Sequence, residues 1–399
     1  MFGHKRIPSR EGGVEIVVEE LCTRLVRDGH TVVCYNRAGH HVSGAEYDAK
    51  IKNQYKGIKL KTVPTIEKKG LAAVSSSFFA ALCCAFGRYD VVHIHAEGPA
   101  FFAWLPKLFG KKVVVTIHGI DWQREKWKNG FGSKFIRQGE RNAVKYADEI
   151  IVLSKGVQDY FLETYGRKTH FIPNGVNRPV IKNAEIITEK YGLTKDSYFL
   201  FLGRLVPEKG ICYLVEAFKQ IKTDKKLVIA GGSSDTDEFA CKLKELSKSD
   251  SRIIFTGFVQ GEILDELYSN AYVYTLPSDL EGMPLSLLEA MSYGNCCLVS
   301  DIPECTEVVE NKAVIFKKSN VSELVRKLQE NCDNSRKVRE LKKVASNFIL
   351  SKYNWDDVVK KTELRRQMPG FRRQSVRIWR WLPMQIRHFR DRVMRAPGW

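Results

Sequence analysis

The stretch SYFLFLGRLVPEKGICYLVEAFKQI, residues 197–221, contains a strand, a tight loop and a helix in immediate succession. Residues 198–202 are a continuous run of aromatic and aliphatic side chains, which is typical of a strand covered on both faces of a parallel sheet. The loop GRLVPEKG follows at 203–210, and an apolar helical segment begins at Ile211. This order predicts one strand-loop-helix unit of an α/β fold.

The same unit recurs along most of the chain. Other strand-like runs alternate with helix-length segments at 90–96, 111–118, 148–154 and 168–174, and again from 226 to 301. The segment IPNGVNRP, residues 172–179, breaks the alternation with Pro, Gly and Asn, as expected for a linker. We therefore predict two Rossmann-like domains with parallel sheets that face a common cleft, because ligands bind at the carboxyl ends of such strands. The predicted units are an N-terminal domain (1–176), a C-terminal domain (177–352), a helix that returns towards the N-terminal domain (353–366) and a basic tail (367–399).

Composition and length agree with a globular two-domain protein. The chain has 399 residues, of which 44% are hydrophobic and 28% are charged. The longest apolar run, residues 71–86, is broken by three serines, and MFGHKRIPSREGG has no apolar signal core, which predicts a cytoplasmic protein. MFGH itself resembles the end of a first strand, so we expect the start to lie a few residues upstream. Ten cysteines without paired C-x-x-C motifs indicate reduced core thiols.

Two loops at predicted strand ends suit a phosphorylated ligand. Gly12 and Gly13 precede a helix, whose positive end and exposed amides attract anions, although a simple tight turn is equally compatible. Arg204 and Lys209 flank the loop after residue 202, where two cations suit a diphosphate. A merely solvated Lys209 is the alternative. The motifs G-x-G-x-x-G and G-x-x-x-x-G-K-[ST] are absent, which disfavours a dehydrogenase and a Walker-type NTPase.

A third loop, EGMPLSLLE at 281–289, places Glu281 and Glu289 eight residues apart. Eight helical residues rise about 12 Å, whereas the paired carboxylates of a glycosidase stand roughly 5 to 9.5 Å apart. The spacing favours two contacts along one extended ligand, and each carboxylate can accept hydrogen bonds from a sugar diol. Pro284 suits the first helical turn. The alternative is one surface glutamate and one partner of the helix dipole.

Taken together, these motifs resemble the retaining glycosyltransferases of family 4, which have the GT-B fold. The resemblance covers nearly all of residues 1–366 and rests on five motifs in order: TIHG at 116–119, IPNGV at 172–176, R-x4-K at 204–209, E-x7-E at 281–289 and YNW at 353–355. The opening REGGVEIVVEEL is most similar to bacterial rhamnosyl and related polysaccharide glycosyltransferases. The family often has Gly-Leu where this chain has Met283 and Pro284, so the identity of the donor sugar stays open.

The resemblance implies a role for each matching residue. Glu281 would contact the donor sugar, Glu289 would hold the ribose, and Arg204 and Lys209 would neutralise the diphosphate. His118 would lie beside the transferred sugar, although a histidine at a strand end can equally belong to the core. The remaining residues implied to line the donor site are Gly12, Gly13, Gly231, Gly232, Val259, Met283, Pro284 and Leu285.

The expected reaction moves a sugar from a nucleotide-diphosphate sugar to an acceptor hydroxyl with retention, without a metal or other cofactor. The resemblance places it in bacterial cell-surface polysaccharide or glycolipid synthesis, with a glycan or lipid-linked acceptor. One rival is a metal-dependent transferase that uses Asp235-Thr236-Asp237, because D-x-D can bind Mg²⁺ or Mn²⁺. Helix capping is the alternative role for that triplet. Another rival is a non-catalytic protein that binds sugars or nucleotides.

Half of the net charge of +18 lies in residues 364–399, which carry ten Arg, one Asp and no Lys. The body shows no stripe of basic and aromatic residues, so we expect no nucleic-acid partner. Apolar residues at 376, 379, 382, 386, 389 and 393 predict an amphipathic helix within 371–395, kinked at Pro383. Such a helix can lie on an anionic membrane, here the inner face of the plasma membrane. Docking on the protein itself or disorder are the alternatives.

Overall fold

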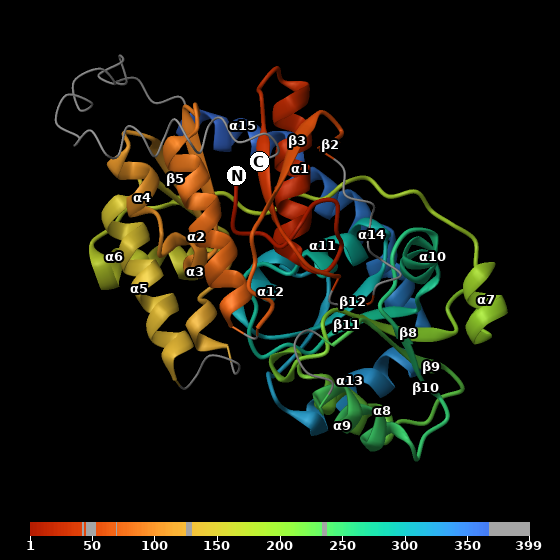
Figure 1. The fold of residues 1–399 in the computed structure, drawn as a ribbon. Helices are drawn as coiled ribbons and strands as arrows, with labels where there is room; N and C mark the ends of the chain where they lie inside the picture. The colour runs from red at the N-terminus through yellow and green to blue at the C-terminus, as the bar shows by residue number, and fades with distance from the viewer. Residues whose placement is uncertain (42–43, 45–52, 69, 125–129, 234–237, 367–399) are drawn as a thin grey trace, which may run out of the picture.

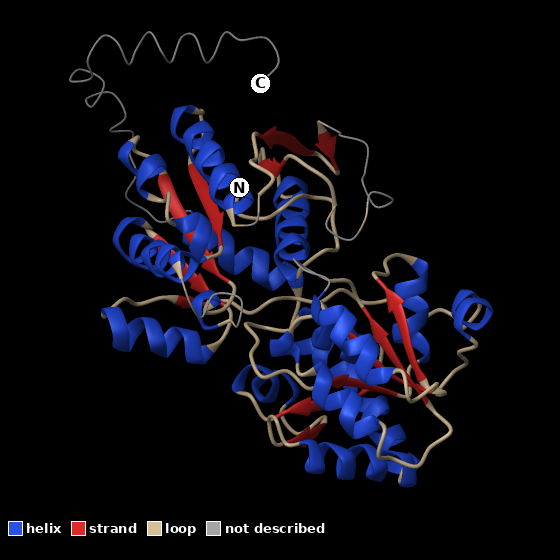
Figure 2. Ribbon diagram, turned by 60° about the horizontal axis from the view of Figure 1, so that its bottom comes forward, coloured by secondary structure: helices blue, strands red, loops and turns tan. Residues whose placement is uncertain are grey.

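The computed structural model describes residues 1–366 except 42–43, 45–52, 69, 125–129 and 234–237. Two α/β lobes lie side by side, and in each lobe helices cover both faces of a twisted sheet (Figures 1 and 2). Parallel pairing joins every neighbouring pair of strands except β2 and β3. The α/β prediction with two parallel sheets is therefore confirmed. The predicted tail, 367–399, lies outside the described residues.

The N-terminal lobe contains two strand groups, ordered β1-β3-β2 and β4-β5-β6-β7. Its strands are β1 (Val33–Arg37), β2 (Gln54–Tyr55), β3 (Ile58–Val63), β4 (Val91–His95), β5 (Lys112–Ile117), β6 (Glu149–Val152) and β7 (His170–Phe171). Its helices are α1 (Gly13–Arg27), α2 (Leu71–Phe86), α3 (Glu97–Ala100), α4 (Trp104–Leu108), η2 (Asp121–Gln123), α5 (Phe131–Tyr146) and α6 (Lys155–Tyr165). The sequence analysis missed the pair β2 and β3.

Backbone hydrogen bonds of Met1 and Phe2 connect these two strand groups. The amide of Tyr35 in β1 donates to the Met1 carbonyl at 3.0 Å. On the other side, the Phe2 amide donates to His93 at 3.1 Å, and the His95 amide donates to Phe2 at 2.9 Å. Phe2 is fully buried. The segment that reads as the end of a strand therefore occupies a strand position between β1 and β4.

The C-terminal lobe has one six-stranded sheet, ordered β10-β9-β8-β11-β12-β13. Its strands are β8 (Tyr198–Leu202), β9 (Lys226–Ala230), β10 (Ile253–Gly257), β11 (Val273–Leu276), β12 (Cys296–Ser300) and β13 (Val314–Phe316). Its helices are α7 (Ile186–Tyr191), η4 (Pro207–Lys209), α8 (Ile211–Phe218), α9 (Glu238–Ser247), α10 (Glu262–Asn270), α11 (Leu285–Ser292), α12 (Pro303–Val309), α13 (Val321–Asp333) and α14 (Ser335–Lys352). The opening stretch of the sequence forms β8, η4 and α8, and β8 lies at the centre of this sheet. The short edge strand β13 was not predicted.

The chain crosses between the lobes twice, and the two crossings touch. The Val176 amide donates to the Tyr353 carbonyl at 3.0 Å. A Cβ on Gly175 would lie 2.6 Å from the backbone nitrogen of Trp355, so this contact excludes any side chain. The final helix α15 (Trp355–Arg366) then lies against α1 in the N-terminal lobe (Figure 1). Two predicted motifs, IPNGV and YNW, therefore form one packed crossover.

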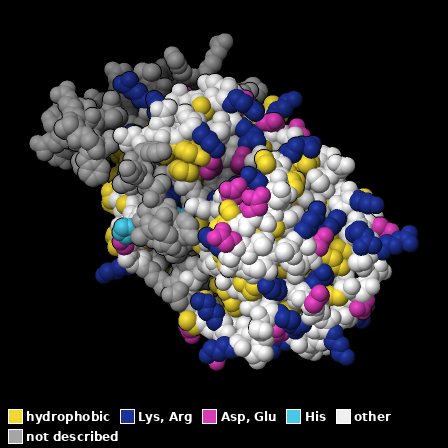
Figure 3. All heavy atoms as spheres, turned by 90° about the vertical axis from the view of Figure 1, so that its right-hand side faces the viewer, with side chains coloured by type: hydrophobic (Ala, Val, Ile, Leu, Met, Phe, Trp, Pro, Cys, Tyr) yellow, Lys and Arg dark blue, Asp and Glu magenta, His cyan; other side chains and the backbone are white. Residues whose placement is uncertain are grey.

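Several bulk expectations can be compared with the described residues. Six of the ten cysteines are buried, as expected for core thiols, whereas Cys83 and Cys241 are exposed. Within the described part of the chain, no helix has both the length and the apolar character that crossing a bilayer requires. On the face shown in Figure 3, Lys and Arg are interspersed with Asp and Glu.

Candidate functional site

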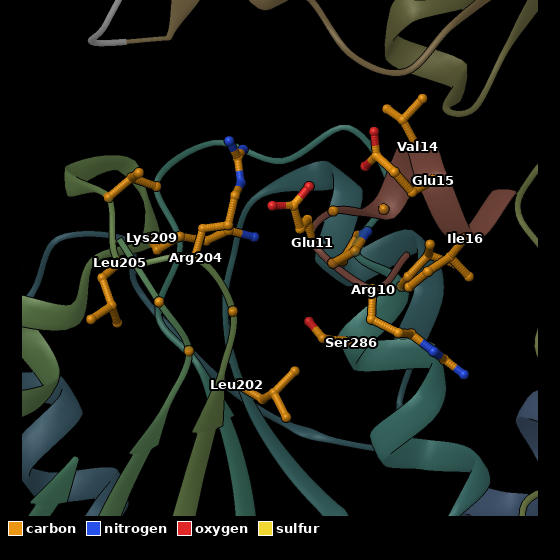
Figure 4. Close-up of a pocket in the computed structure, with 18 of the residues that line it drawn as sticks. Arg10, Glu11, Val14, Glu15, Ile16, Leu202, Arg204, Leu205, Lys209 and Ser286 are labelled. Carbon is orange, nitrogen blue, oxygen red and sulfur yellow. The ribbon is translucent and has the colours of Figure 1, made fainter. Parts of the chain in front are cut away.

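A cleft of about 840 Å³ lies between the two lobes, and its walls come from both. It is lined by all of the site residues predicted from the sequence: Gly12, Gly13, His118, Arg204, Lys209, Gly231, Gly232, Val259, Glu281, Met283, Pro284, Leu285 and Glu289. Figure 4 shows Arg204 and Lys209 on loops of one wall and residues 10–16 on the other. These residues are scattered over some 280 positions of sequence, and the fold brings them to one place.

The C-terminal wall is built from loops that follow the carboxyl ends of adjacent strands. Gly203 and Arg204 follow β8, whereas Gly231 and Gly232 follow β9. Gly231 has a positive φ of +147°, and a Cβ there would lie 1.8 Å from the Gly203 carbonyl oxygen. Because Gly231 has no side chain, the loops after β8 and β9 can approach each other closely. This close approach leaves room for a ligand above the two loops.

Arg204 is one of the two cations that the sequence predicts on this wall. Its side chain makes no hydrogen bond or ion pair with any residue in the described ranges. Burial lowers the pKa of Arg204, and the nearby positive charge of Arg124 lowers it further. Arg204 is half-buried and lines the cleft, so its guanidinium is accessible to a ligand there. An anion in the cleft would supply the missing partner.

Lys209 and Glu281 form an ion pair within the C-terminal wall. Lys209 Nζ lies 2.6 Å from Glu281 Oε1, and their side chains are only 13% and 8% exposed. The Ser278 hydroxyl donates to the same oxygen at 2.7 Å. The sequence analysis assigned these two residues to different parts of the ligand, but it did not predict that they bind each other.

Glu289 is paired across the cleft. Arg10, from the loop before α1, donates to Glu289 Oε1 at 2.9 Å. The Tyr268 hydroxyl donates to Oε2 at 3.2 Å. Burial raises the pKa of Glu289, while Arg10 and Tyr268 act in the opposite direction. Both oxygens predicted to bind a ribose therefore have protein partners, one of them from the other lobe.

Glu281 and Glu289 lie before and within a helix, as expected, but Pro284 is not in the first turn of that helix. α11 begins at Leu285, and Pro284 is the residue that caps it with an extended ψ of 102° rather than the first helical residue. Glu281 therefore lies in the loop ahead of the helix, and Glu289 lies inside the helix.

His118 lies at the closest approach of the two lobes. A Cβ on Gly282 would lie 1.7 Å from the His118 carbonyl oxygen, so the backbones touch here. His118 Nε2 and His95 Nδ1 are 3.1 Å apart, and burial lowers the pKa of His118 to about 4. The ring is therefore neutral near pH 7 and can serve as a hydrogen-bonding group, not as a fixed cation.

The N-terminal wall presents the start of α1 to the cleft. Gly12 precedes the helix in an extended conformation with φ −161°, which other residues also adopt. A Cβ on Gly13 would lie 3.4 Å from the Leu285 side chain in the opposite wall. Gly13 therefore allows close approach between the walls, whereas a Cβ on Gly12 would lie 2.7 Å from the Glu15 carboxylate of the same helix. The first amides of α1 have no partner inside the helix and are available to an anion.

Met283, one of the two residues that depart from the family pattern, contacts the crossover segment. The Asn174 amide points to Met283 Sδ at 3.0 Å, and Asn174 Nδ2 donates to the Met283 carbonyl at 3.4 Å. The IPNG motif therefore supports the loop that carries Glu281.

The sequence analysis missed several charged residues of the cleft. They are Lys5, Arg10, Glu11, Glu15, Arg37, Asp121, Arg124, Glu208, Glu238 and Lys242. Asp121 and Arg124 belong to GIDWQR, directly after the TIHG motif at the end of β5. Their position at a strand end was the signal that could have found them.

Metal binding was also considered for the cleft. Within the described ranges, no group of three or more His, Cys, Asp or Glu side chains could hold a metal ion. Asp235, Thr236 and Asp237 of the predicted D-x-D rival lie outside the described residues.

Two family models match consecutive parts of the chain. The model described as Glycosyltransferase Family 4 matches residues 11–178, and Glycosyl transferases group 1 matches residues 183–348. The division falls at the crossover between the lobes, so each match covers one lobe.

Individual proteins give the same result. An uncharacterised glycosyltransferase of Methanocaldococcus jannaschii is 25% identical over 375 residues, which span 89% of this chain and 94% of that protein. The Escherichia coli UDP-Gal:alpha-D-GlcNAc-diphosphoundecaprenol alpha-1,3-galactosyltransferase is 29% identical over 241 residues, 56% of this chain and 61% of that one. The structure of HepE from Anabaena with UDP-glucose superposes with a TM-score of 0.74 at 16% identity, covering 91% of this chain and 97% of HepE. The chain therefore belongs to glycosyltransferase family 4, has the GT-B fold and is a glycosyltransferase.

Proposed function

We propose that this enzyme transfers a sugar from a nucleotide-diphosphate sugar to an acceptor hydroxyl, with retention of the anomeric configuration. The nucleotide would lie towards Glu289 and Val259, the diphosphate at Arg204, and the transferred sugar between Glu281 and His118. HepE, which shares the fold, binds UDP-glucose, and this supports a nucleotide-sugar donor.

The observation that carries the proposal is the guanidinium of Arg204, which has no hydrogen-bond or ion-pair partner among the described residues. It faces the start of α1 across the cleft, so a cation and a helix N-terminus converge on the same space. Both groups stabilise negative charge. A departing diphosphate gains negative charge during transfer, and preorganised positive groups lower the barrier to that step.

The remaining residues suit transfer better than hydrolysis by a carboxylate pair. Glu281 is bound to Lys209, and Glu289 is bound to Arg10 and Tyr268. Neither is a free acid or base beside an attacking water. Their positions at two separate points of the cleft instead suit the recognition of hydroxyl groups on one donor.

The test is a panel of nucleotide sugars assayed for nucleoside diphosphate release with wild type and Arg204→Ala. We expect wild-type turnover with at least one donor and a loss of kcat/KM of about 10² to 10³-fold in the variant, comparable to removing one oxyanion donor. Unchanged turnover in a folded Arg204→Ala protein would refute the proposal. NMR of the glycoside product reports retention, and assays in excess EDTA test the proposed independence from metal.

For the acceptor we propose a glycan or lipid-linked glycan of a bacterial cell surface. The Escherichia coli relative acts on a diphosphoundecaprenol acceptor, which supports a lipid-linked substrate. The basic sequence of 371–395 supports attachment to the inner face of the plasma membrane. Full-length protein should co-sediment with anionic liposomes, and a chain ending at residue 366 should not. Equal sedimentation would contradict the role of the tail.

A further inference from the structure

The N-terminal wall carries an arginine for which the family resemblance gives no role. Arg124 follows η2 and lines the cleft. Its Nε lies 2.9 Å from Asp121 Oδ1. Nη2 lies 3.8 Å from the position of a Cβ on Gly119, and that same position is 3.0 Å from the Gly282 Cα in the opposite lobe. The end of the Arg124 side chain therefore reaches the point where the two lobes meet.

Arg124 and Arg204 face the same part of the cleft from opposite walls. Arg124 is the nearby charge that contributes most, after burial, to the lowered pKa of Arg204. The negative charges of Asp121 and Glu208 act to raise the pKa of both guanidiniums. Asp121 is already paired with Arg124, and Glu281 with Lys209. The two guanidiniums therefore share a space to which Asp121 and Glu208 also contribute negative charge, and within the described ranges only Arg124 of the two arginines has an ion pair.

The position of Arg124 is fixed from behind the wall. Glu97 is fully buried, and its Oε2 accepts a hydrogen bond from the Asp121 amide at 2.9 Å. Burial and the neighbouring Asp121 raise the pKa of Glu97 well above its usual range. Glu140, also fully buried, accepts from Trp122 Nε1 at 3.2 Å. Two buried carboxyl groups thus hold a helix of three residues, which keeps Arg124 directed at the cleft before any ligand binds.

We propose that Arg124 is a second arginine for the donor diphosphate, which Arg124 and Arg204 bind together from the two lobes. This rests on the proposed function, because it assumes a diphosphate at Arg204. Guanidinium groups form paired hydrogen bonds with phosphate oxygens, so two arginines can divide the oxygens of one diphosphate between them. One anion would then satisfy Arg204, remove the repulsion between the arginines and hold the lobes together.

The test is calorimetric titration of wild type, Arg124→Gln and Arg137→Gln. The titrants are UDP, ADP, GDP, dTDP and the matching nucleosides. Arg137 is the matched control because it stacks on Trp122 of the same short helix at 4.1 Å but does not line the cleft. We expect at least tenfold weaker diphosphate binding by Arg124→Gln, unchanged nucleoside binding, and wild-type affinities for Arg137→Gln. Arg124→Lys keeps the positive charge but not the paired donors of the guanidinium, so it should lose less diphosphate affinity than Arg124→Gln. This variant replaces Arg124→Gln in the experiment if the latter fails to fold.

Each outcome decides between the two proposals. Unchanged diphosphate affinity in Arg124→Gln, with weakened binding in Arg204→Ala, would overturn only the role of Arg124. That result combined with lost sugar transfer would assign Arg124 to the acceptor instead. Unchanged affinity in both variants, or no binding of any diphosphate by wild type, would overturn the proposed diphosphate site as well.

Discussion

The two walls of the cleft are built in different ways. The C-terminal wall takes Arg204, Lys209 and Glu281 from loops that follow neighbouring parallel strands, and its ion pair between Lys209 and Glu281 is internal and nearly buried. The N-terminal wall contributes Arg10, which is 45% exposed and reaches across the cleft to Glu289. One wall is preformed, whereas part of the other is positioned by a contact between lobes.

The two ion pairs should therefore respond differently to a change in the distance between the lobes. A buried pair keeps its geometry when the lobes move, because both partners belong to one rigid unit. A pair between lobes would break if the lobes separated, and a ligand that uses the same carboxylate would compete with it. Three substitutions test this distinction.

Gly282→Ala should have the largest effect, because it acts on the contact between the walls. The new methyl group would lie 1.7 Å from the His118 carbonyl oxygen, so the lobes must separate. Misplacement of reacting groups by about 1 Å can cost roughly 10²-fold in rate. We expect a loss of kcat/KM of about that size, with a melting temperature near that of wild type and a larger radius of gyration by small-angle scattering.

The control for this variant is Gly156→Ala in α6, where an added Cβ meets no atom within 4 Å. It should keep wild-type activity and dimensions. An active Gly282→Ala enzyme with unchanged dimensions would show that the contact between the lobes is not needed for turnover.

Lys209→Met should have the next largest effect, now on stability. It leaves Glu281 buried with only the Ser278 hydroxyl as partner. Because removing Lys209 leaves a nearly buried carboxylate without one of its two hydrogen-bond donors, we expect a loss of about 2 kcal/mol in the free energy of unfolding. Chemical denaturation measures this value. The double variant Lys209→Met/Glu281→Gln should recover part of it, and a loss that the second change does not reduce would contradict a paired origin.

Arg10→Met should have the smallest effect on stability. Its ion pair with Glu289 is partly exposed, so solvent screens it, and we expect a change below about 1 kcal/mol. The difference from wild type should shrink further in 0.5 M salt (about 4 Å Debye length) because the pair reaches solvent. The same denaturation experiment provides the comparison. If Arg10→Met destabilises the protein as much as Lys209→Met does, the contrast between the two walls is wrong.

Much of this site could be predicted from the sequence because its motifs are local. Arg204, Lys209, Glu281 and Glu289 lie in loops whose flanking strands and helices are marked by apolar runs and by glycine. Parallel strands bring such loops to one edge of a sheet. Short strands at the edge of a sheet were the hardest to predict. In β13, three residues are too few to show an apolar periodicity.

Asp121 and Arg124 were not predicted as site residues for a related reason. The η2 helix that precedes Arg124 has three residues and no apolar period, and its support comes from Glu97 and Glu140, far away in sequence. Buried carboxyl groups look like surface residues in a sequence, because charge alone does not show whether a side chain has a partner.

The α/β architecture, the two lobes, the loops that carry the site and the family could all be predicted from the sequence. These follow from periodic apolar patterns and short motifs, which act over a few residues. The partners became known only from the folded structure: Arg10 with Glu289, Lys209 with Glu281, Met1–Phe2 between β1 and β4, and Arg204 with none in the described chain. Pairing depends on distances between segments far apart in the chain, and those distances exist only once both lobes have folded and met.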